Sequence, residues 1–410
     1  MVKNRRFPPV SVNYFLSKAN SVFLGLVFSI LYSRALGPES KGILTVVFLS
    51  TVLFSQIING GIDLSFRSRL NGIEPKESAP EYFTFSILSS LLITAITLII
   101  VQFYALFKVP IASNYLIVSI GYVFLAVFSE QVTQYLLSLG NFQSLWKIEM
   151  PTIFFQMSTY IVLLKFSTLS TAVSVLLSFS FSYLVIIFRG YKVILKSIHF
   201  ESAKGTLHLK VLKLIRISRD NFFYNFLLSL IDRFDRLIVL WVFSTSVFGK
   251  YSVATGIILT ARFFPETIGN LILGNQSGGM RRIFQKFKTL TVLVLLVLPV
   301  TLGILVQAFI KQFFGDSWTI GLLVIVLFAY SELFRAIYFV QVNRLLHDGE
   351  RHTLHYKTAL FMALVSLSAG LAAHLTQNLA IVPAGMLIGY LIVSMKFFAV
   401  LNTSITRRNR

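Results

Sequence analysis

Twelve long apolar stretches constrain this chain more than any other feature of its sequence. A helix needs about 20 apolar residues to cross roughly 30 Å of hydrocarbon. Only 13% of the residues are charged, whereas a soluble domain carries about 25%, so most of the surface must face lipid. The sequence therefore predicts an all-α integral membrane protein. Its candidate spans lie at 12–33, 42–62, 82–106, 114–139, 145–164, 169–189, 217–243, 250–273, 289–310, 319–343, 353–375 and 379–398.

Positive charge predicts the orientation of these spans. The chain has 37 Lys and Arg residues against 16 Asp and Glu, a net charge of +21. Most of the basic residues fall in alternate interhelical segments, and such segments face the cytoplasm. We therefore expect both termini in the cytoplasm and attribute the positive charge to topology rather than to nucleic acid. The first apolar run lacks a small-residue cleavage site, which predicts a retained helix. Cysteine is absent, so disulfides and thiolate metal sites are excluded.

A long polar stretch midway along the chain divides the spans into two sets of six. We expect a six-helix half at 1–190, a basic cytoplasmic linker at 191–216 and a second six-helix half at 217–410. The halves share the spacing of their spans, although residue identity between them is weak. Six spans per half give both halves one orientation. The spacing thus predicts a pseudo-two-fold axis along the membrane normal and a central cavity as the substrate path.

Ionisable residues inside spans are costly, and they usually face a bundle interior or a cavity. The span at 217–243 is the richest in them. At about 100° per residue, its polar residues occupy roughly a third of the helix circumference, whereas Arg233 points elsewhere. This stripe either lines a polar cavity or forms a structural pair that locks helices together. It comprises Asn221, Asn225, Asp232, Asp235 and Arg236.

Acidic and basic residues also recur at helical spacing within single spans. Asp232 and Arg236 are four residues apart, as are Arg262 and Glu266. Glu332 and Arg335 are three apart. Because residues three or four apart are neighbours on a helix, we expect local ion pairs.

Two further charged residues stand apart from these pairs. Lys18, in the first span, either faces the same cavity or extends to the cytoplasmic surface. Glu130 lies on an otherwise apolar face without a local basic partner. It is therefore a candidate for a titrating carboxylate that couples transport to H⁺ or Na⁺.

These cations together suggest a substrate class. Arginine binds phosphate oxygens bidentately, so a cavity that contains Arg236, Arg262, Arg335 and Lys18 suits a large anionic, sugar-bearing substrate. Asp232, Asp235, Glu266 and Glu332 would hold these cations when the site is empty. The chain has no P-loop, nucleophile triad or metal-ligand cluster. We therefore expect neither an enzyme nor a cofactor or metal site.

Five short motifs occur in order along the chain. They are Arg34-Ala35-Leu36-Gly37-Pro38-Glu39-Ser40-Lys41-Gly42, Asp232-Arg233-Phe234-Asp235-Arg236-Leu237, Phe248-Gly249-Lys250-Tyr251-Ser252-Val253-Ala254, Phe313-Phe314-Gly315 and Leu346-His347-Asp348-Gly349-Glu350. With these motifs the chain resembles the polysaccharide-transporter branch of the multidrug/oligosaccharidyl-lipid/polysaccharide exporter superfamily, which contains the O-antigen flippases. The resemblance covers the full length and depends on the order of loose motifs. Lys41, Asp348 and Glu350 depart from the usual residues, in what we expect to be loops.

The resemblance implies a function, a place and partners. Members of this branch transport undecaprenyl-diphosphate-linked oligosaccharide, the repeat unit of O-antigen, capsule or exopolysaccharide, from the inner to the outer leaflet. They use alternating access without ATP hydrolysis. The expected location is the bacterial cytoplasmic membrane. The expected partners are the lipid-linked oligosaccharide, membrane lipids, and the polysaccharide polymerase and chain-length machinery.

Three alternatives remain open on the sequence. A major-facilitator transporter also has twelve spans, but the loop after span 2 lacks the second glycine of that family's marker. A drug or cation antiporter of the same superfamily would have an acidic or apolar cavity rather than one with arginines. A membrane-embedded polymerase or glycosyltransferase would need a large extramembrane loop, and the expected outside loops are short.

Overall fold

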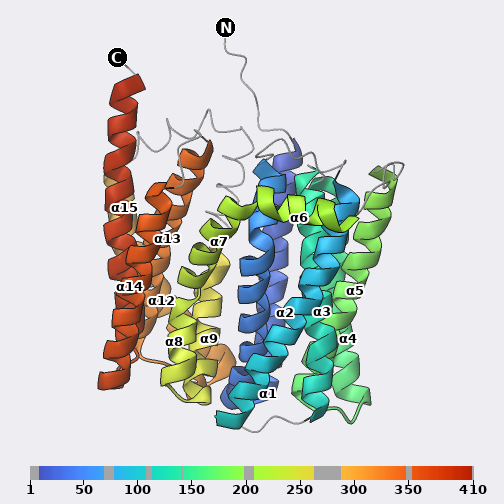
Figure 1. Ribbon diagram of the computed structural model, residues 1–410. Helices are drawn as coiled ribbons and strands as arrows, with labels where there is room; N and C mark the ends of the chain where they lie inside the picture. Colours follow the sequence, from blue (N-terminus) through green and yellow to red (C-terminus); the bar gives the residue numbers. More distant parts are fainter. Residues whose placement is uncertain are drawn as a thin grey trace. The chain divides into compact units, whose positions relative to one another are not determined.

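The protein forms two compact helical units, Met1–Leu230 and Ile231–Arg410, which we describe separately. The computed structural model describes residues 9–68, 78–107, 113–139, 142–197, 207–262, 288–347 and 353–408. Within these residues every regular element is a helix (Figure 1). The predicted all-α membrane fold is confirmed.

The first unit accounts for the first six predicted spans. Two of them are halves of one kinked helix, and a short amphipathic helix follows the sixth. The elements are α1 (Pro9–Ser68), α2 (Ala79–Phe107), α3 (Ser113–Ser138), α4 (Phe142–Phe166), α5 (Thr171–Ser197), α6 (Leu207–Ile217) and α7 (Arg219–Ile231).

The kink in α1 replaces the loop that we expected between the first two spans. Gly37 adopts a φ of 75° and is followed by Pro38, so glycine is required for the positive φ and proline interrupts the hydrogen-bond ladder. Helix continues directly on both sides of the kink. Lys41 consequently lies in a helix with only 5% of its surface exposed, which corrects the expectation that it sits in a loop.

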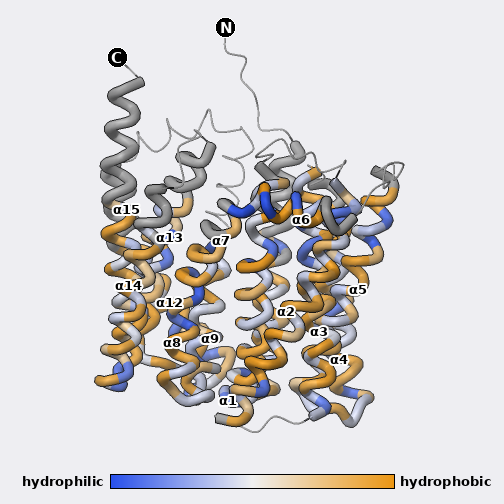
Figure 2. The backbone as a smooth tube through the Cα atoms, viewed as in Figure 1, coloured by the Kyte–Doolittle hydropathy of each residue, from blue (hydrophilic) through white to orange (hydrophobic). Residues whose placement is uncertain are grey.

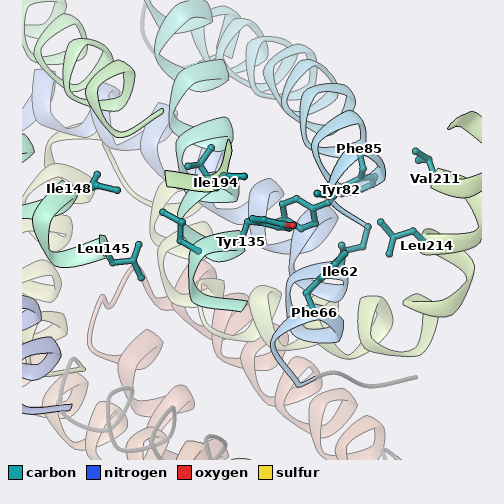
Figure 3. Packing of buried hydrophobic residues seen from close by; sticks show 13 residues of the cluster. Ile62, Phe66, Tyr82, Phe85, Tyr135, Leu145, Ile148, Ile194, Val211 and Leu214 are labelled. Atoms are coloured by element: carbon teal, nitrogen blue, oxygen red, sulfur yellow. The ribbon is translucent and has the colours of Figure 1, made fainter. Parts of the chain in front are cut away.

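The core of the first unit includes the basic helix α6. Phe66, Tyr82 and Tyr135 bring three aromatic rings together, and Val211 and Leu214 of α6 belong to the same buried cluster (Figure 3). In Figure 1, α6 lies across the end of α2. Burial of one face of α6 explains why this charged segment is an ordered helix.

The second unit begins at Ile231, the last residue of α7, and contains the later described helices. Helix α13 packs on α12 and α15, α14 packs on α15, and α8 packs on α9 and α14. The elements are α8 (Phe234–Val242), α9 (Thr245–Leu259), the short helix η2 (Thr260–Arg262), α12 (Lys288–Phe314), η4 (Asp316–Trp318), α13 (Leu322–His347), α14 (Thr353–Thr376) and α15 (Ile381–Arg408).

The helices are apolar enough to cross a membrane. Among the described residues, six have both the length and the hydropathy that a span requires, and Leu360–Thr376 and Ile381–Met395 are shorter apolar helices. Apolar residues cover the helices in Figure 2. Large apolar side chains such as Ile99 and Leu375 are exposed, as expected for surfaces in contact with lipid tails. The protein is therefore a multi-pass membrane protein.

Gly61 provides a stability test of the first unit. A Cβ at this position would lie 2.5 Å from the Cα of Phe222 and 2.6 Å from its backbone nitrogen, and backbone atoms of α7 cannot move aside. We expect Gly61→Ala to lower the stability by about 1–3 kcal/mol through overpacking, measured as thermal melting in detergent. Gly25→Ala is the control, because nothing lies within 4 Å of its Cβ position. Equal melting of both variants would contradict this close approach.

Candidate functional site

The predicted span at 217–243 is broken in the middle. Helix α7 ends at Ile231 and α8 begins at Phe234, which leaves Asp232 and Arg233 in a turn. Arg233 occupies the N-cap position of α8, with φ −126° and ψ 4°, and its side chain makes no capping hydrogen bond. The break separates Asp232 from the helical register of Asp235 and Arg236.

Asp232 and Glu332 each hold an arginine from another helix. Arg335 donates from Nε and Nη2 to the two carboxylate oxygens of Asp232, at 2.7 Å each. Arg262 donates from Nε and Nη2 to Glu332, at 2.5 Å each. The Nη1 atom of Arg262 also lies 3.8 Å from Oδ2 of Asp232, so the four residues form one network. Tyr390 adds a hydrogen bond to Asp232 Oδ1 at 3.3 Å.

These partners differ from those expected from helical spacing. The sequence suggested that Asp232 pairs with Arg236 and Glu332 with Arg335. Instead, both carboxylates bind arginines from different elements, which are 103 and 70 residues away in the chain. The expected pairing of Arg262 with Glu266 cannot be compared, because Glu266 lies outside the described residues.

Arg236 is held less tightly than Arg262 and Arg335. Its Nε lies 4.0 Å from Oδ2 of Asp235, and that oxygen already accepts a hydrogen bond from Tyr251 at 2.9 Å. Only 7% of the Arg236 surface is exposed. The charge is therefore buried with a weak contact to a shared carboxylate.

Three buried guanidinium nitrogens lack an acceptor among the residues that the structure describes. They are Nε of Arg233, Nη2 of Arg236 and Nη1 of Arg335. Because Arg233 lies in the turn between α7 and α8, the helical spacing that set it apart from the polar stripe does not apply to it. We call Arg233, Arg236, Arg262 and Arg335 the arginine cluster. Because an unsatisfied buried donor is costly, the cluster is suited to an additional anionic acceptor.

Glu130 of the first unit borders a cavity. Ser55 of α1 donates a hydrogen bond of 2.7 Å to Glu130 Oε2. The cavity has a volume of about 280 Å³. Hydroxyl groups and one carboxylate provide its polar lining. It is lined by Thr51, Val52, Tyr122, Ala126, Ser129, Glu130, Thr133, Tyr183 and Ile186.

A second carboxylate of the first unit was missed in the sequence. Asp63 accepts hydrogen bonds from Tyr82 Oη at 2.8 Å and from Gln131 Nε2 at 3.2 Å. The predicted span at 42–62 ends just before Asp63, but α1 continues through this residue to Ser68. The position of Asp63 four residues after Asn59 on the helix was the signal that could have identified it.

The remaining predicted residues are placed only by their helices. Lys18 lies on α1, and Asn221 and Asn225 lie on α7, but their side chains are outside the description. Their roles stay predictions.

Comparisons with known proteins agree with this architecture. A family model described as polysaccharide biosynthesis protein matches residues 31–321. Comparison with curated protein sequences gives no match. The lipid II flippase MurJ in an inward closed conformation has a similar fold, with a TM-score of 0.71 and 13% identity over 95% of this chain and 87% of that chain.

Two transporters of the wider superfamily share the fold as well. The Vibrio cholerae MATE transporter VcmN, in a mutant form, gives a TM-score of 0.65 with 11% identity over 97% of both chains. A superfamily transporter from Pyrococcus furiosus gives 0.63 with 14% identity over 98% of this chain and 96% of that chain. At these identities the likeness concerns the fold alone.

Proposed function

The chain belongs to the polysaccharide biosynthesis protein family, and on this premise we propose that it is a lipid-linked oligosaccharide flippase. It moves undecaprenyl-diphosphate-linked oligosaccharide from the inner to the outer leaflet by alternating access, without ATP hydrolysis or covalent chemistry. The repeat unit of O-antigen, capsule or exopolysaccharide is the cargo. The similarity of the fold to a lipid II flippase supports this class of substrate.

The observation that carries the proposal is the surplus of guanidinium donors in the arginine cluster. The constant charged part of the cargo is a diphosphate, and an unpaired charge in hydrocarbon is very costly. Arginine binds phosphate oxygens bidentately and keeps its charge. The buried nitrogens of Arg233, Arg236 and Arg335 that lack an acceptor among the described residues would donate to the diphosphate.

The carboxylates hold the cluster together when no cargo is bound. Asp232 and Glu332 keep Arg335 and Arg262 in bidentate pairs, which limits the cost of an empty site. Arg236 has only a 4.0 Å contact with Asp235. Arg236 is therefore the arginine that can bind the diphosphate first, with its N–H groups as donors.

The proposed location is the bacterial cytoplasmic membrane, with both termini in the cytoplasm. The polysaccharide polymerase and chain-length machinery are the proposed partners. The topology can be tested with single cysteines, because the native chain has none. A cysteine at Lys165 is expected to react with an impermeant reagent added outside, and one at Ser197 only with reagent that reaches the cytoplasmic face. Labelling of both from one side would contradict the topology.

Coupling is assigned to Glu130. Its carboxylate borders the cavity and accepts a hydrogen bond from Ser55, so gain or loss of a proton would change a polar contact between α1 and α3. We expect Glu130→Gln to abolish the pH dependence of export while the protein still folds, since glutamine retains the hydrogen-bonding capacity. The measurement is surface polysaccharide as a function of medium pH. The Ser55→Ala variant is measured in parallel, because it removes the hydrogen bond but keeps the carboxylate. The comparison separates the effect of protonating Glu130 from the effect of losing its contact with Ser55. An unchanged pH profile in Glu130→Gln would remove this residue from the mechanism.

A further inference from the structure

Helix α6 lies over one end of the first unit. Val211 and Leu214 of α6 are buried in a cluster with residues of α1 to α5 (Figure 3). Each of those residues lies within about two turns of an end of its helix. The ends are alternately C-terminal and N-terminal, as one side of an antiparallel bundle requires. Because α2, α3 and α5 are long apolar helices that can cross a bilayer, α6 lies at a membrane surface.

The opposite face of α6 is exposed and carries both apolar and basic side chains. At about 100° per residue, its members cover nearly half of the helix circumference. Leu212 is 59% exposed and Ile215 is 43% exposed, and Lys213 and Arg216 are exposed as well. Figure 2 shows hydrophilic and hydrophobic residues mixed along α6. We call Leu212, Lys213, Ile215 and Arg216 the outer face of α6.

The outer face has its apolar and basic residues on different sides. By helical spacing, Ile215 and Leu212 follow directly after the buried side of the helix, and Arg216 and Lys213 come next around the circumference. Neither Lys213 nor Arg216 has a carboxylate partner among the residues that the structure describes. The order around the helix is therefore buried, exposed apolar, and exposed basic without an ion pair.

This order fits a helix in the plane of a membrane interface. Leu212 and Ile215 would be exposed to water on a helix outside the membrane, whereas at the interface they enter the acyl-chain boundary. Lysine and arginine side chains extend from such a position to the level of the lipid phosphates. Two unpaired cations at that level attract anionic headgroups, while a zwitterionic headgroup has no net charge to attract them.

Helix α6 is also joined to α7 without a gap in the hydrogen bonding. The backbone N–H of Ser218, the one residue between them, donates to Leu214 at 3.1 Å, and that of Phe222 in α7 donates to Ser218 at 2.9 Å. Helix α7 ends at Ile231, directly before the turn that carries Asp232 and Arg233. Whatever binds α6 therefore also holds the first turn of the helix that leads to the arginine cluster.

We propose that the outer face of α6 is a binding surface for anionic phospholipids. Lys213 and Arg216 bind the phosphates of the headgroups, Leu212 and Ile215 lie among the acyl chains, and the bound lipid holds the start of α7 at the membrane surface. In the proposed topology these lipids belong to the cytoplasmic leaflet, which carries negative surface charge. The inference goes beyond the proposed function, because it involves neither the cargo nor the arginine cluster.

The experiment measures the lipid preference of α6 directly. The native chain has no cysteine, so Leu212→Cys can carry a single apolar fluorophore. The labelled protein is reconstituted in phosphatidylcholine vesicles that contain increasing fractions of nitroxide-bearing phosphatidylglycerol or, in parallel, nitroxide-bearing phosphatidylcholine. Quenching by each lipid gives their relative affinity. A preference for phosphatidylglycerol of about fivefold for each cation is expected, hence about 30-fold for Lys213 and Arg216 together.

Charge variants and salt test the origin of this preference. Lys213→Gln/Arg216→Gln is expected to bring it close to one. Lys165→Gln/Lys311→Gln is the control, because it removes two exposed lysines elsewhere and is expected to keep the preference. Salt at about 1 M shortens the screening length to about 3 Å, so it is expected to weaken the preference in the protein with all its charges, even if the charge variant does not fold.

Three results would overturn the proposal. Equal quenching by the two lipids would show that α6 does not select anionic headgroups, and quenching by neither would show that its outer face does not touch the membrane. Equal loss of preference in Lys213→Gln/Arg216→Gln and in the control would assign the effect to the total charge of the protein. Since no cargo is present, each of these results leaves the diphosphate assignment to be decided by its own test.

Discussion

Export of surface polysaccharide is expected to fall to near zero when Arg236 is replaced by Gln. The buried charge of Arg236 has only a 4.0 Å contact with Asp235 and a nitrogen without an acceptor among the described residues, so its removal breaks few internal contacts. It would remove one of the proposed donors to the diphosphate, whose charge is costly to leave unpaired in hydrocarbon. Loss of a hydrogen-bonded charge partner at a desolvated site costs about 2–5 kcal/mol, which corresponds to a loss of roughly 30-fold or more in binding at 1.4 kcal/mol per tenfold.

Charge and packing can be separated at this position. Arg236→Lys is expected to retain partial export, because the charge remains but the bidentate geometry does not. The Arg236→Gln/Arg262→Gln double variant is expected to stop export while the protein still inserts. The assay is surface polysaccharide in a flippase-null strain, with each variant at matched membrane abundance. Arg189→Gln is the matched control, because this arginine of α5 is exposed. Wild-type polymer levels in the double variant would show that these arginines are structural, and the substrate assignment would lose its main support.

Stability is expected to fall sharply when Asp232 is replaced by Asn. Asp232 accepts both hydrogen bonds from Arg335 and lies 3.8 Å from Arg262. Its neutralisation therefore leaves the buried Arg335 and the partly buried Arg262 with a single carboxylate of this network, Glu332. Breaking one partner of a buried ion pair costs about 3–5 kcal/mol, because an uncompensated charge stays buried. The expected result is a large drop in the melting temperature of the purified protein in detergent.

A double-mutant cycle distinguishes a lost interaction from a general defect. Asp232→Asn combined with Arg335→Gln removes both members of the pair and is expected to melt above the sum of the single effects. Asp316→Asn is the control. Asp316 forms an exposed pair with Lys311, at 3.5 Å, and exposed pairs contribute little to stability. Additive effects of the two buried substitutions would show that the network does not hold the second unit together.

The sequence by itself determined the membrane architecture. A bilayer requires long apolar helices whose backbone groups are all satisfied internally, so hydropathy was sufficient to predict the all-α membrane fold. The cost of a charge in hydrocarbon likewise singled out Asp232, Arg236 and Arg335 as candidate functional residues. These inferences depend on the lipid bilayer that surrounds the helices rather than on contacts between distant residues. A single sequence was therefore sufficient to make them.

Only the tertiary structure decided which charges meet. Helical spacing determines which residues are neighbours on one helix, but a carboxylate binds the guanidinium with the best geometry, and packing brought Arg335 to Asp232 from 103 residues away. The same limit applies to Lys41 and Asp63, which looked like loop residues until the kink at Gly37 and the length of α1 placed both inside the first unit. The spacing of residues along the chain does not show where a helix bends or which helices pack together. Both depend on side chains from segments that are distant in the sequence.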